Sequence, residues 1–177
     1  MNRLLLAMFL VTLPLGGCAD YQQSGDGSPG KSNYQWSSLY RQDIRTVAVP
    51  IFTNVDFARG DEFTLSKALV TQIEQKTPYK VVDRERADTI LEGQIVRVRR
   101  QNVSAERGSN LPQEQLYGIR VNFTWKDLRT GRVLVERRGF EQNNAFYPYL
   151  GEGRQHGAMN TAEALALAIV QEMQADW

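Results

Sequence analysis

The stretch Tyr117–Trp125, YGIRVNFTW, alternates apolar and polar side chains along its length. Because successive side chains of a β-strand point to opposite faces, Tyr117 and Trp125 would face a core together with Ile119, Val121 and Phe123. Arg120, Asn122 and Thr124 would face the other way. The stretch therefore predicts a strand with one buried and one polar face, and the rest of the fold must supply a layer that covers the buried face.

Long strands are predicted on both sides of this stretch. The segment Thr89–Val103 carries Leu91 and Ile95 on one face. A β-bulge near Ile95 and Val96 would keep Val96 and Val98 inward and turn Arg97 and Arg99 outward. The segment Asp127–Phe140 predicts a hairpin, with Gly131 at the left-handed position of a short turn.

Two amphipathic helices and two shorter strands complete the predicted domain. Thr46–Phe52 is an apolar, β-branched run typical of a central strand, and Tyr79–Val82 predicts a short strand parallel to it. The helix Asp61–Thr77 between them buries Leu65, Leu69 and Ile73, and Pro78 ends it. The last helix is predicted to begin with a capping box at Asn160 and Glu163, and it presents Leu165, Ile169, Met173 and Trp177 on one face.

The predicted order of elements is β-α-β-β-β-β-α. This order favours an α+β fold, a two-layer sandwich in which two helices cover one face of a mixed sheet of four to five strands.

The N-terminus reads as a bacterial lipoprotein signal. Arg3 and the free amine precede the apolar run Leu4–Leu15, which is shorter than the roughly 20 residues that a membrane-spanning helix needs. Leu15-Gly16-Gly17-Cys18 resembles a lipobox, in which the cysteine becomes the lipid-bearing first residue of the mature protein. Residues 1–17 are therefore predicted to be a signal peptide and Cys18 the site of N-acyl and S-diacylglycerol attachment. Such acyl chains would anchor the protein to a membrane.

The mature chain is predicted to have two parts. Residues 18–39 are rich in Gly, Ser, Gln and Asn and predict a flexible tether, and residues 40–177 form the globular domain. Ala19 rather than Asp follows the cysteine, and in enteric lipoproteins this favours the outer membrane over retention at the inner one.

The composition limits the kinds of ligand and catalytic site that the protein can have. Lys and Arg number 21 against 20 Asp and Glu, so the formal charge is +1 and no global field favours nucleic acid. One cysteine and one histidine, His156, leave almost no material for a metal site or a His-dependent triad. Gly151–Gly157, GEGRQHG, lacks the GK[ST] ending of a phosphate loop. We therefore expect no enzymatic activity and no cofactor besides the covalent lipid.

Two long connections are the remaining candidates for function. Asn102–Glu114 would join two antiparallel strands and Glu141–Asn160 would lead to the last helix, at the same edge of the sheet. Candidate ligand-binding residues are arginines in or near them, namely Arg97, Arg99, Arg100, Arg107 and Arg154. Candidate partner contacts are the aromatic residues of the second connection, namely Phe146, Tyr147 and Tyr149. Guanidinium groups beside exposed aromatic rings suit an anionic amphiphile or a protein groove. Alternatively, the aromatic rings fold back over the sheet and the arginines only keep the surface soluble.

The order of several motifs resembles the LptE family of lipopolysaccharide-assembly lipoproteins. These motifs are the lipobox, IRTVAVPIFTN, TPYKVVD, ADTILEGQI, DLRTGRVL and the Ala-rich last helix. The resemblance implies a non-catalytic lipoprotein at the inner leaflet of the outer membrane, which acts as partner and plug of the β-barrel LptD and binds lipopolysaccharide. The family's basic loop residues do not align by motif, so Arg107 and Arg154 correspond by location only.

A second resemblance points to another class of function. VAVPIFTN followed by a helix and VVDRERAD is also similar to lipoproteins that activate peptidoglycan synthases and to CsgG-type secretion subunits. These would make the chain a periplasmic protein-binding module without a lipid site. The short tether counts against a synthase activator, because Pro-rich spacers extend about 3.1 Å per residue and about twenty residues cross only part of the periplasm.

Overall fold

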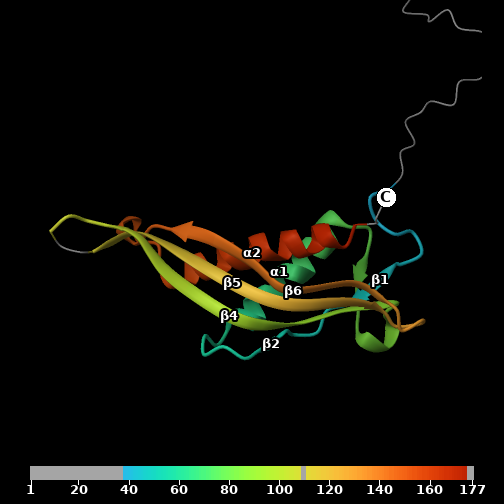
Figure 1. Cartoon of the computed structure of the whole chain (residues 1–177). Coiled ribbons are helices and arrows are strands. Elements are labelled where there is room, and N and C mark those ends of the chain that lie inside the picture. Colours follow the sequence, from blue (N-terminus) through green and yellow to red (C-terminus); the bar gives the residue numbers. More distant parts are fainter. Residues whose placement is uncertain (1–37, 109–110, 175–177) are drawn as a thin grey trace, which may run out of the picture. The chain divides into compact units, whose positions relative to one another are not determined.

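The computed structural model describes residues 38–108 and 111–174. The predicted signal peptide, Cys18, nearly all of the predicted tether and Trp177 lie outside the described residues. The elements, shown in Figure 1, are β1 Thr46–Ala48, β2 Thr53–Asn54, α1 Asp61–Lys76, β3 Lys80–Val81, η1 Arg84–Arg86, β4 Thr89–Ala105, β5 Pro112–Asp127, β6 Val133–Phe146, η2 Pro148–Leu150 and α2 Arg154–Glu172.

The fold is an α+β two-layer sandwich, as predicted. The sheet runs in the order β3-β1-β4-β5-β6, with β2 pairing to β4 off this path. β1 pairs in parallel with β3 and β4, whereas β4, β5 and β6 are antiparallel neighbours. Both helices lie on the same face of this mixed sheet (Figure 1). Neither described helix has the length and hydropathy needed to cross a bilayer.

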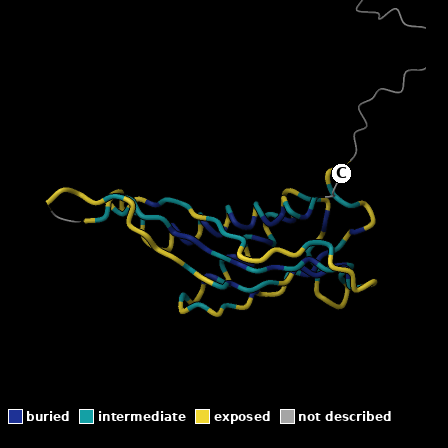
Figure 2. Tube along the Cα trace, viewed as in Figure 1, coloured by how far each residue is buried: buried dark blue, intermediate teal, exposed yellow. Residues whose placement is uncertain are grey.

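β5 confirms the predicted alternation. Its inward residues are all 2% exposed or less, namely Tyr117, Ile119, Val121, Phe123 and Trp125. They pack against the apolar stripes of the helices, which include Leu65, Leu69 and Ile73 of α1 and Leu165, Ile169 and Met173 of α2. In the Cα trace of Figure 2, buried positions are dark blue and occur both in the sheet and in the helices. The bulge predicted near Ile95 is present as a register shift between Ile95 and Arg97, and Gly131 adopts the predicted left-handed conformation, with φ of 72°.

The strand predicted over Thr46–Phe52 is interrupted. β1 and β2 both pair in parallel with β4, at successive stretches of that strand. Together they therefore occupy one position in the strand order, beside β4. Pro50 lies between them and has no N–H to donate to a neighbouring strand. The backbone N–H of Phe52 instead donates to Oγ of Ser66 at 3.0 Å, and the Phe52 side chain enters the core.

The two long connections are shorter than predicted. β4 continues to Ala105 and β5 begins at Pro112, so only residues 106–111 connect them. β6 continues to Phe146, and residues 147–153 lead to α2. The end of β4 is largely exposed and the end of β6 carries the polar run of residues 141–144, so both lack the alternation of apolar and polar residues that reveals a half-buried strand in the sequence.

The start of α2 also differs from the prediction. The helix begins at Arg154, and Asn160 lies inside it, where its carbonyl accepts a hydrogen bond from Nδ2 of Asn144 at 3.0 Å. Gly157 explains how the first turns reach the sheet, because a Cβ there would meet the ring of Phe146 at 2.7 Å. Glycine therefore allows the helix to rest directly on Phe146.

Candidate functional site

Three arginines converge on one pocket at the end of the domain where both helices begin. The pocket has a volume of about 440 Å³ and is lined by Phe57, Ala58, Arg59, Val98, Arg100, Tyr117 and Arg154. Arg59 precedes α1, Arg100 lies on β4 and Arg154 is the first residue of α2. We call this the arginine pocket.

The loop that carries Arg59 is held by a set of short-range hydrogen bonds. Nδ2 of Asn54 donates to the carbonyl of Ala58 at 2.8 Å and to Oε2 of Glu62 at 2.7 Å. Oδ2 of Asp56 accepts from the backbone N–H of Val98 at 3.0 Å, and this bond lowers the pKa of Asp56. These bonds fix the loop against β4. They leave Phe57 at the rim of the pocket with 99% of its surface exposed.

A buried pair of polar side chains lies at the base of the pocket. The hydroxyl of Tyr117 donates to Oδ2 of Asp61 at 2.7 Å, and Nη1 of Arg154 donates to the Tyr117 hydroxyl oxygen at 3.5 Å. Burial raises the pKa of Asp61, while the Tyr117 hydrogen bond and the charge of Arg154 partly oppose this rise. Burial, with the bond to Asp61, also raises the pKa of Tyr117. These two hydrogen bonds, which run from Asp61 through Tyr117 to Arg154, thus link the starts of α1 and α2 across β5.

The charge of the pocket is partly offset by nearby carboxylates, since the charge of Arg154 acts on the pKa of Asp61 and that of Arg59 on the pKa of Glu62. Among the described ion pairs, none involves Arg59, Arg100 or Arg154. Neither helix has a side-chain N-cap, and Gly60 and Gly153 occupy the N-cap positions. The positive end of the α2 dipole therefore adds to the field of the guanidinium groups, whereas Asp61 and Glu62 in the first turn of α1 offset the dipole of that helix. An arginine fork binds phosphate or carboxylate through two parallel hydrogen bonds, so this arrangement suits an anionic group.

The five arginines predicted as ligand-binding residues fall in three places. Arg100 and Arg154 line the arginine pocket. Arg97 pairs in register with Arg120 and Arg99 with Gly118, on the face of the sheet away from the helices. Arg107 lies in the turn between β4 and β5, where Figure 1 shows the hairpin extending past the start of α2. The bulge places Arg97 and Arg99 outward as predicted, and the register then turns Arg100 toward the helix side.

The aromatic residues predicted to contact a partner also separate. Phe146 is buried in the core, with 2% of its surface exposed, so it is not an exposed contact residue. Tyr147 and Tyr149 stay partly or largely exposed and pack edge to face at 6.1 Å. They lie beside Ser104 and Glu114, so the two connections are neighbours, as predicted.

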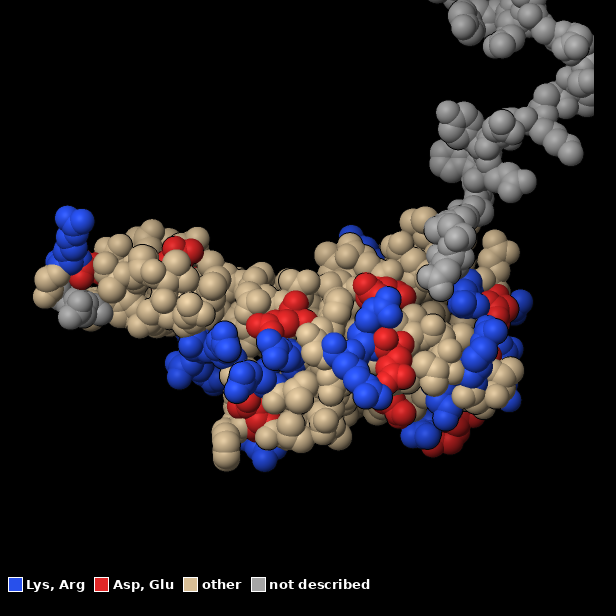
Figure 3. Space-filling model, in the orientation of Figure 1, with Lys and Arg blue, Asp and Glu red and all other residues tan. Residues whose placement is uncertain are grey.

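Further exposed apolar residues occur on the hairpin of β4 and β5 and on η2, namely Val103, Leu111 and Leu150. Figure 3 shows few charged side chains over this end of the domain except at the hairpin turn. We call Val103, Leu111, Tyr147, Tyr149 and Leu150 the apolar end. The apolar end and the arginine pocket are close in sequence, since Leu150 precedes Arg154 by four residues.

The sequence reasoning missed Phe57, Arg59 and the Asp61–Tyr117 pair. Phe57 and Arg59 flank Ala58 in the connection between a predicted strand and a predicted helix, which is a common place for binding residues. That position was a usable signal. The Asp61–Tyr117 pair had none, because its partners are 56 residues apart and each fits its own element without the other.

Comparison with known proteins agrees with the fold and identifies a family. The family model described as LptE, lipopolysaccharide-assembly, matches residues 44–176. The PelC dodecamer from Paraburkholderia phytofirmans is similar in structure with a TM-score of 0.52 at 16% identity, over 78% of this chain and 96% of that one. The hypothetical protein CT253 from Chlamydia trachomatis has a TM-score of 0.51 at 8% identity, over 72% of this chain and 94% of that one. These structural likenesses concern the fold alone. Comparison with curated protein sequences gave no match.

Proposed function

From the premise that this chain belongs to the LptE family of lipopolysaccharide-assembly proteins, we propose that it binds lipopolysaccharide through the arginine pocket. In this proposal it acts at the periplasmic face of the outer membrane, anchored by lipid on Cys18, as partner and plug of an LptD-type β-barrel. The observation that carries the binding site is the convergence of Arg59, Arg100 and Arg154 on one pocket, where none of the three belongs to a described ion pair.

The chemistry of the ligand supports this site. Lipopolysaccharide is an anionic amphiphile, which carries phosphate groups beside acyl chains. The arginine pocket would hold a phosphate through bidentate contacts, which are stronger than neutral hydrogen bonds. Phe57 and the apolar end offer exposed apolar surface for the chains next to it. A pocket of about 440 Å³ is large enough for a head group but not for the whole glycolipid, so the acyl chains would lie along the surface.

The proposed role requires no bond to be made or broken. The LptE family is one of non-enzymatic lipoproteins, and the arginine pocket offers donors for an anion rather than a nucleophile beside a base. The alternative, a periplasmic module that activates a peptidoglycan synthase or belongs to a secretion apparatus, is not favoured by the family match. It also gives no role to the arginine pocket.

The test compares two pairs of charge reversals that change the net charge equally. Arg100→Glu with Arg154→Glu should weaken lipopolysaccharide binding by about tenfold or more, because each replacement removes a charged hydrogen-bond donor and adds repulsion. Arg97→Glu with Arg99→Glu, on the opposite face of the sheet, should change the affinity by about twofold or less. Binding is measured on the purified full chain by calorimetry, with the melting temperature as a check on folding. Equal losses in both variants would show that overall charge, and not the pocket, governs binding.

The partner is tested separately by affinity purification of the tagged protein from membranes. We expect a large outer-membrane β-barrel to be recovered with it. Recovery of a penicillin-binding protein in its place would contradict the proposed partner and favour the synthase-activator alternative.

A further inference from the structure

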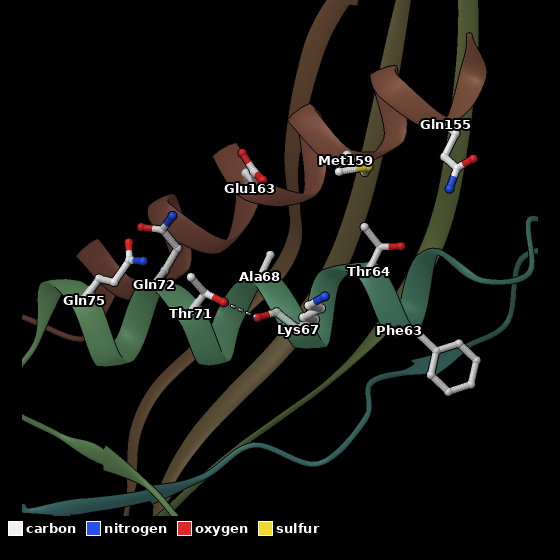
Figure 4. Close-up of a pocket in the computed structure, with 10 residues that line it drawn as sticks. All are labelled: Phe63, Thr64, Lys67, Ala68, Thr71, Gln72, Gln75, Gln155, Met159 and Glu163. Atoms are coloured by element: carbon white, nitrogen blue, oxygen red, sulfur yellow. Dashed lines mark hydrogen bonds between the residues drawn. The ribbon is translucent and has the colours of Figure 1, made fainter.

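A second hollow lies between the two helices, on their side away from the sheet. It has a volume of about 570 Å³, within the range of roughly 300 to 1,000 Å³ that small-ligand sites occupy. Figure 4 shows that one stripe of each helix lines it. Gln155, Met159 and Glu163 follow one another at four-residue spacing on α2, facing α1 from Thr64 to Gln75. We call this the helix groove.

The helix groove differs from the arginine pocket in its charge. It contains one cation, Lys67, and one anion, Glu163, so it offers no net field to a charged ligand. Most of its polar side chains are neutral, and three of them are the amides of Gln72, Gln75 and Gln155. An amide both donates and accepts hydrogen bonds, which matches a ligand whose groups do the same. Hydroxyl groups have this property.

One acceptor in the groove lacks a donor. Oε1 of Gln72 is buried and has no hydrogen-bond partner in the described structure, and Figure 4 shows the Gln72 amide directed toward α2. Leaving a buried acceptor unpaired is costly, so a rotation of the Gln72 side chain that brings this oxygen to a hydrogen-bond donor on a bound ligand would be favourable.

Apolar surface is present as well, but it is divided. Phe63 at one end of the groove is 59% exposed and projects outward (Figure 4), and Met159 on α2 is 47% exposed. The negative face of an aromatic ring attracts the slightly positive C–H groups of a pyranose ring. Two separate apolar side chains among amides fit alternating C–H faces and hydroxyl edges better than the continuous apolar stripe of a docking helix.

We propose that the helix groove binds a neutral, hydroxyl-rich glycan chain. Gln72, Gln75 and Gln155 exchange hydrogen bonds with its hydroxyl groups, and Phe63 packs against a sugar ring that extends past the end of the groove. The glycan could be an uncharged stretch of the saccharide part of a lipopolysaccharide or a free neutral polysaccharide, and both have the same recognition chemistry. The site is independent of the arginine pocket, because the two hollows share no lining residue.

The experiment follows the side-chain amide resonances of the full chain by NMR. The two probes are a neutral gluco-oligosaccharide and the lipid-free polysaccharide released from lipopolysaccharide by mild acid. We expect the amides of Gln72, Gln75 and Gln155 to shift with at least one probe. A response to the released polysaccharide alone identifies lipopolysaccharide as the source, and a response to both indicates general glycan recognition.

Variants then assign the effect. Gln155→Ala and Phe63→Ala should each weaken glycan binding by about fivefold, and Gln72→Leu by a similar factor. Gln101→Leu changes an exposed glutamine of β4 outside the groove and serves as the matched control with unchanged binding. Gln155 and Phe63 are exposed, so their variants remain informative if Gln72→Leu alters folding. Absence of any shift with both probes at millimolar concentration, or equal losses in the Gln101 control, would overturn the proposal.

Arg100→Glu distinguishes this proposal from the preceding one. It should weaken binding of intact lipopolysaccharide and leave the gluco-oligosaccharide shifts as they are. If the glycan shifts persist while lipopolysaccharide binding does not depend on Arg100, the arginine pocket fails alone. If Arg100→Glu weakens lipopolysaccharide binding and no glycan shift is seen, the helix groove fails alone.

Discussion

The two faces of β5 carry opposite chemistry on one strand. On the helix side, the residues from Tyr117 to Trp125 at every second position are buried beneath α1 and α2. On the other side, Arg120, Asn122 and Thr124 are half-buried among polar side chains of β4 and β6. Stability should therefore depend on the first face, whereas the second contributes mainly solubility. Tyr117 is the exception, since its ring belongs to the core while its hydroxyl reaches the base of the arginine pocket.

We expect the largest difference in stability between the two faces when Phe123 and its neighbour Thr124 are each replaced by alanine. Phe123→Ala should lower the free energy of unfolding by about 3–5 kcal/mol, because it removes a buried ring and leaves a cavity. Thr124→Ala, one position along and on the open face, should cost about 0.5 kcal/mol or less. Urea-induced unfolding of both variants measures the difference. Similar losses at the two positions would show that another molecule or segment covers the open face in solution.

Asp61, which accepts the hydrogen bond from Tyr117, should make the stability of the protein depend on pH. Burial raises the pKa of Asp61, so the folded protein holds this proton more tightly than the unfolded chain does. Ionisation of Asp61 therefore removes stability as the pH rises through the raised pKa, and the loss is absent below the ordinary value of about 3.8.

Asp61→Asn stays neutral and can still accept the hydrogen bond from Tyr117, so it should avoid this loss. We expect its advantage over the native protein, on the order of 1 kcal/mol at pH 7, to shrink toward zero as the pH falls below 4. Thermal unfolding of both proteins across this range measures it. An advantage that grows at low pH would contradict the assigned shift.

The smallest expected effect lies on the open face. Arg120 and Glu141 form an ion pair there, and the hydrogen bond from Arg120 lowers the pKa of Glu141. Because 42% of the Arg120 side chain is exposed, water and salt screen the pair. A double-mutant cycle with Arg120→Ala and Glu141→Ala should give a coupling energy of about 0.2–1 kcal/mol that falls as salt is added. A larger, salt-insensitive coupling would mean that this face is shielded from solvent.

Local patterns in the sequence determined most of the elements. The alternation over Tyr117–Trp125, the helical spacing of Leu65, Leu69 and Ile73, and Gly131 in its turn each depend on near neighbours in the chain, and each is confirmed. The α+β class and the family resemblance followed from their order, and the family match confirms the latter. The anchor on Cys18 and the outer-membrane location stay predictions, since that cysteine lies outside the described residues.

Tertiary structure decided what long-range packing controls. The bond from the Phe52 N–H to Ser66 and the close approach of Gly157 to Phe146 join residues far apart in the sequence, and such contacts are not visible in a local pattern. The same holds for the arginines. After the bulge in β4, pairing with β5 fixes the strand register. This register places Arg100 on one face of the sheet and Arg99 on the other. The sequence thus determined which side chains the protein has for binding an anion, and the register and helix packing determined which of them meet in one pocket.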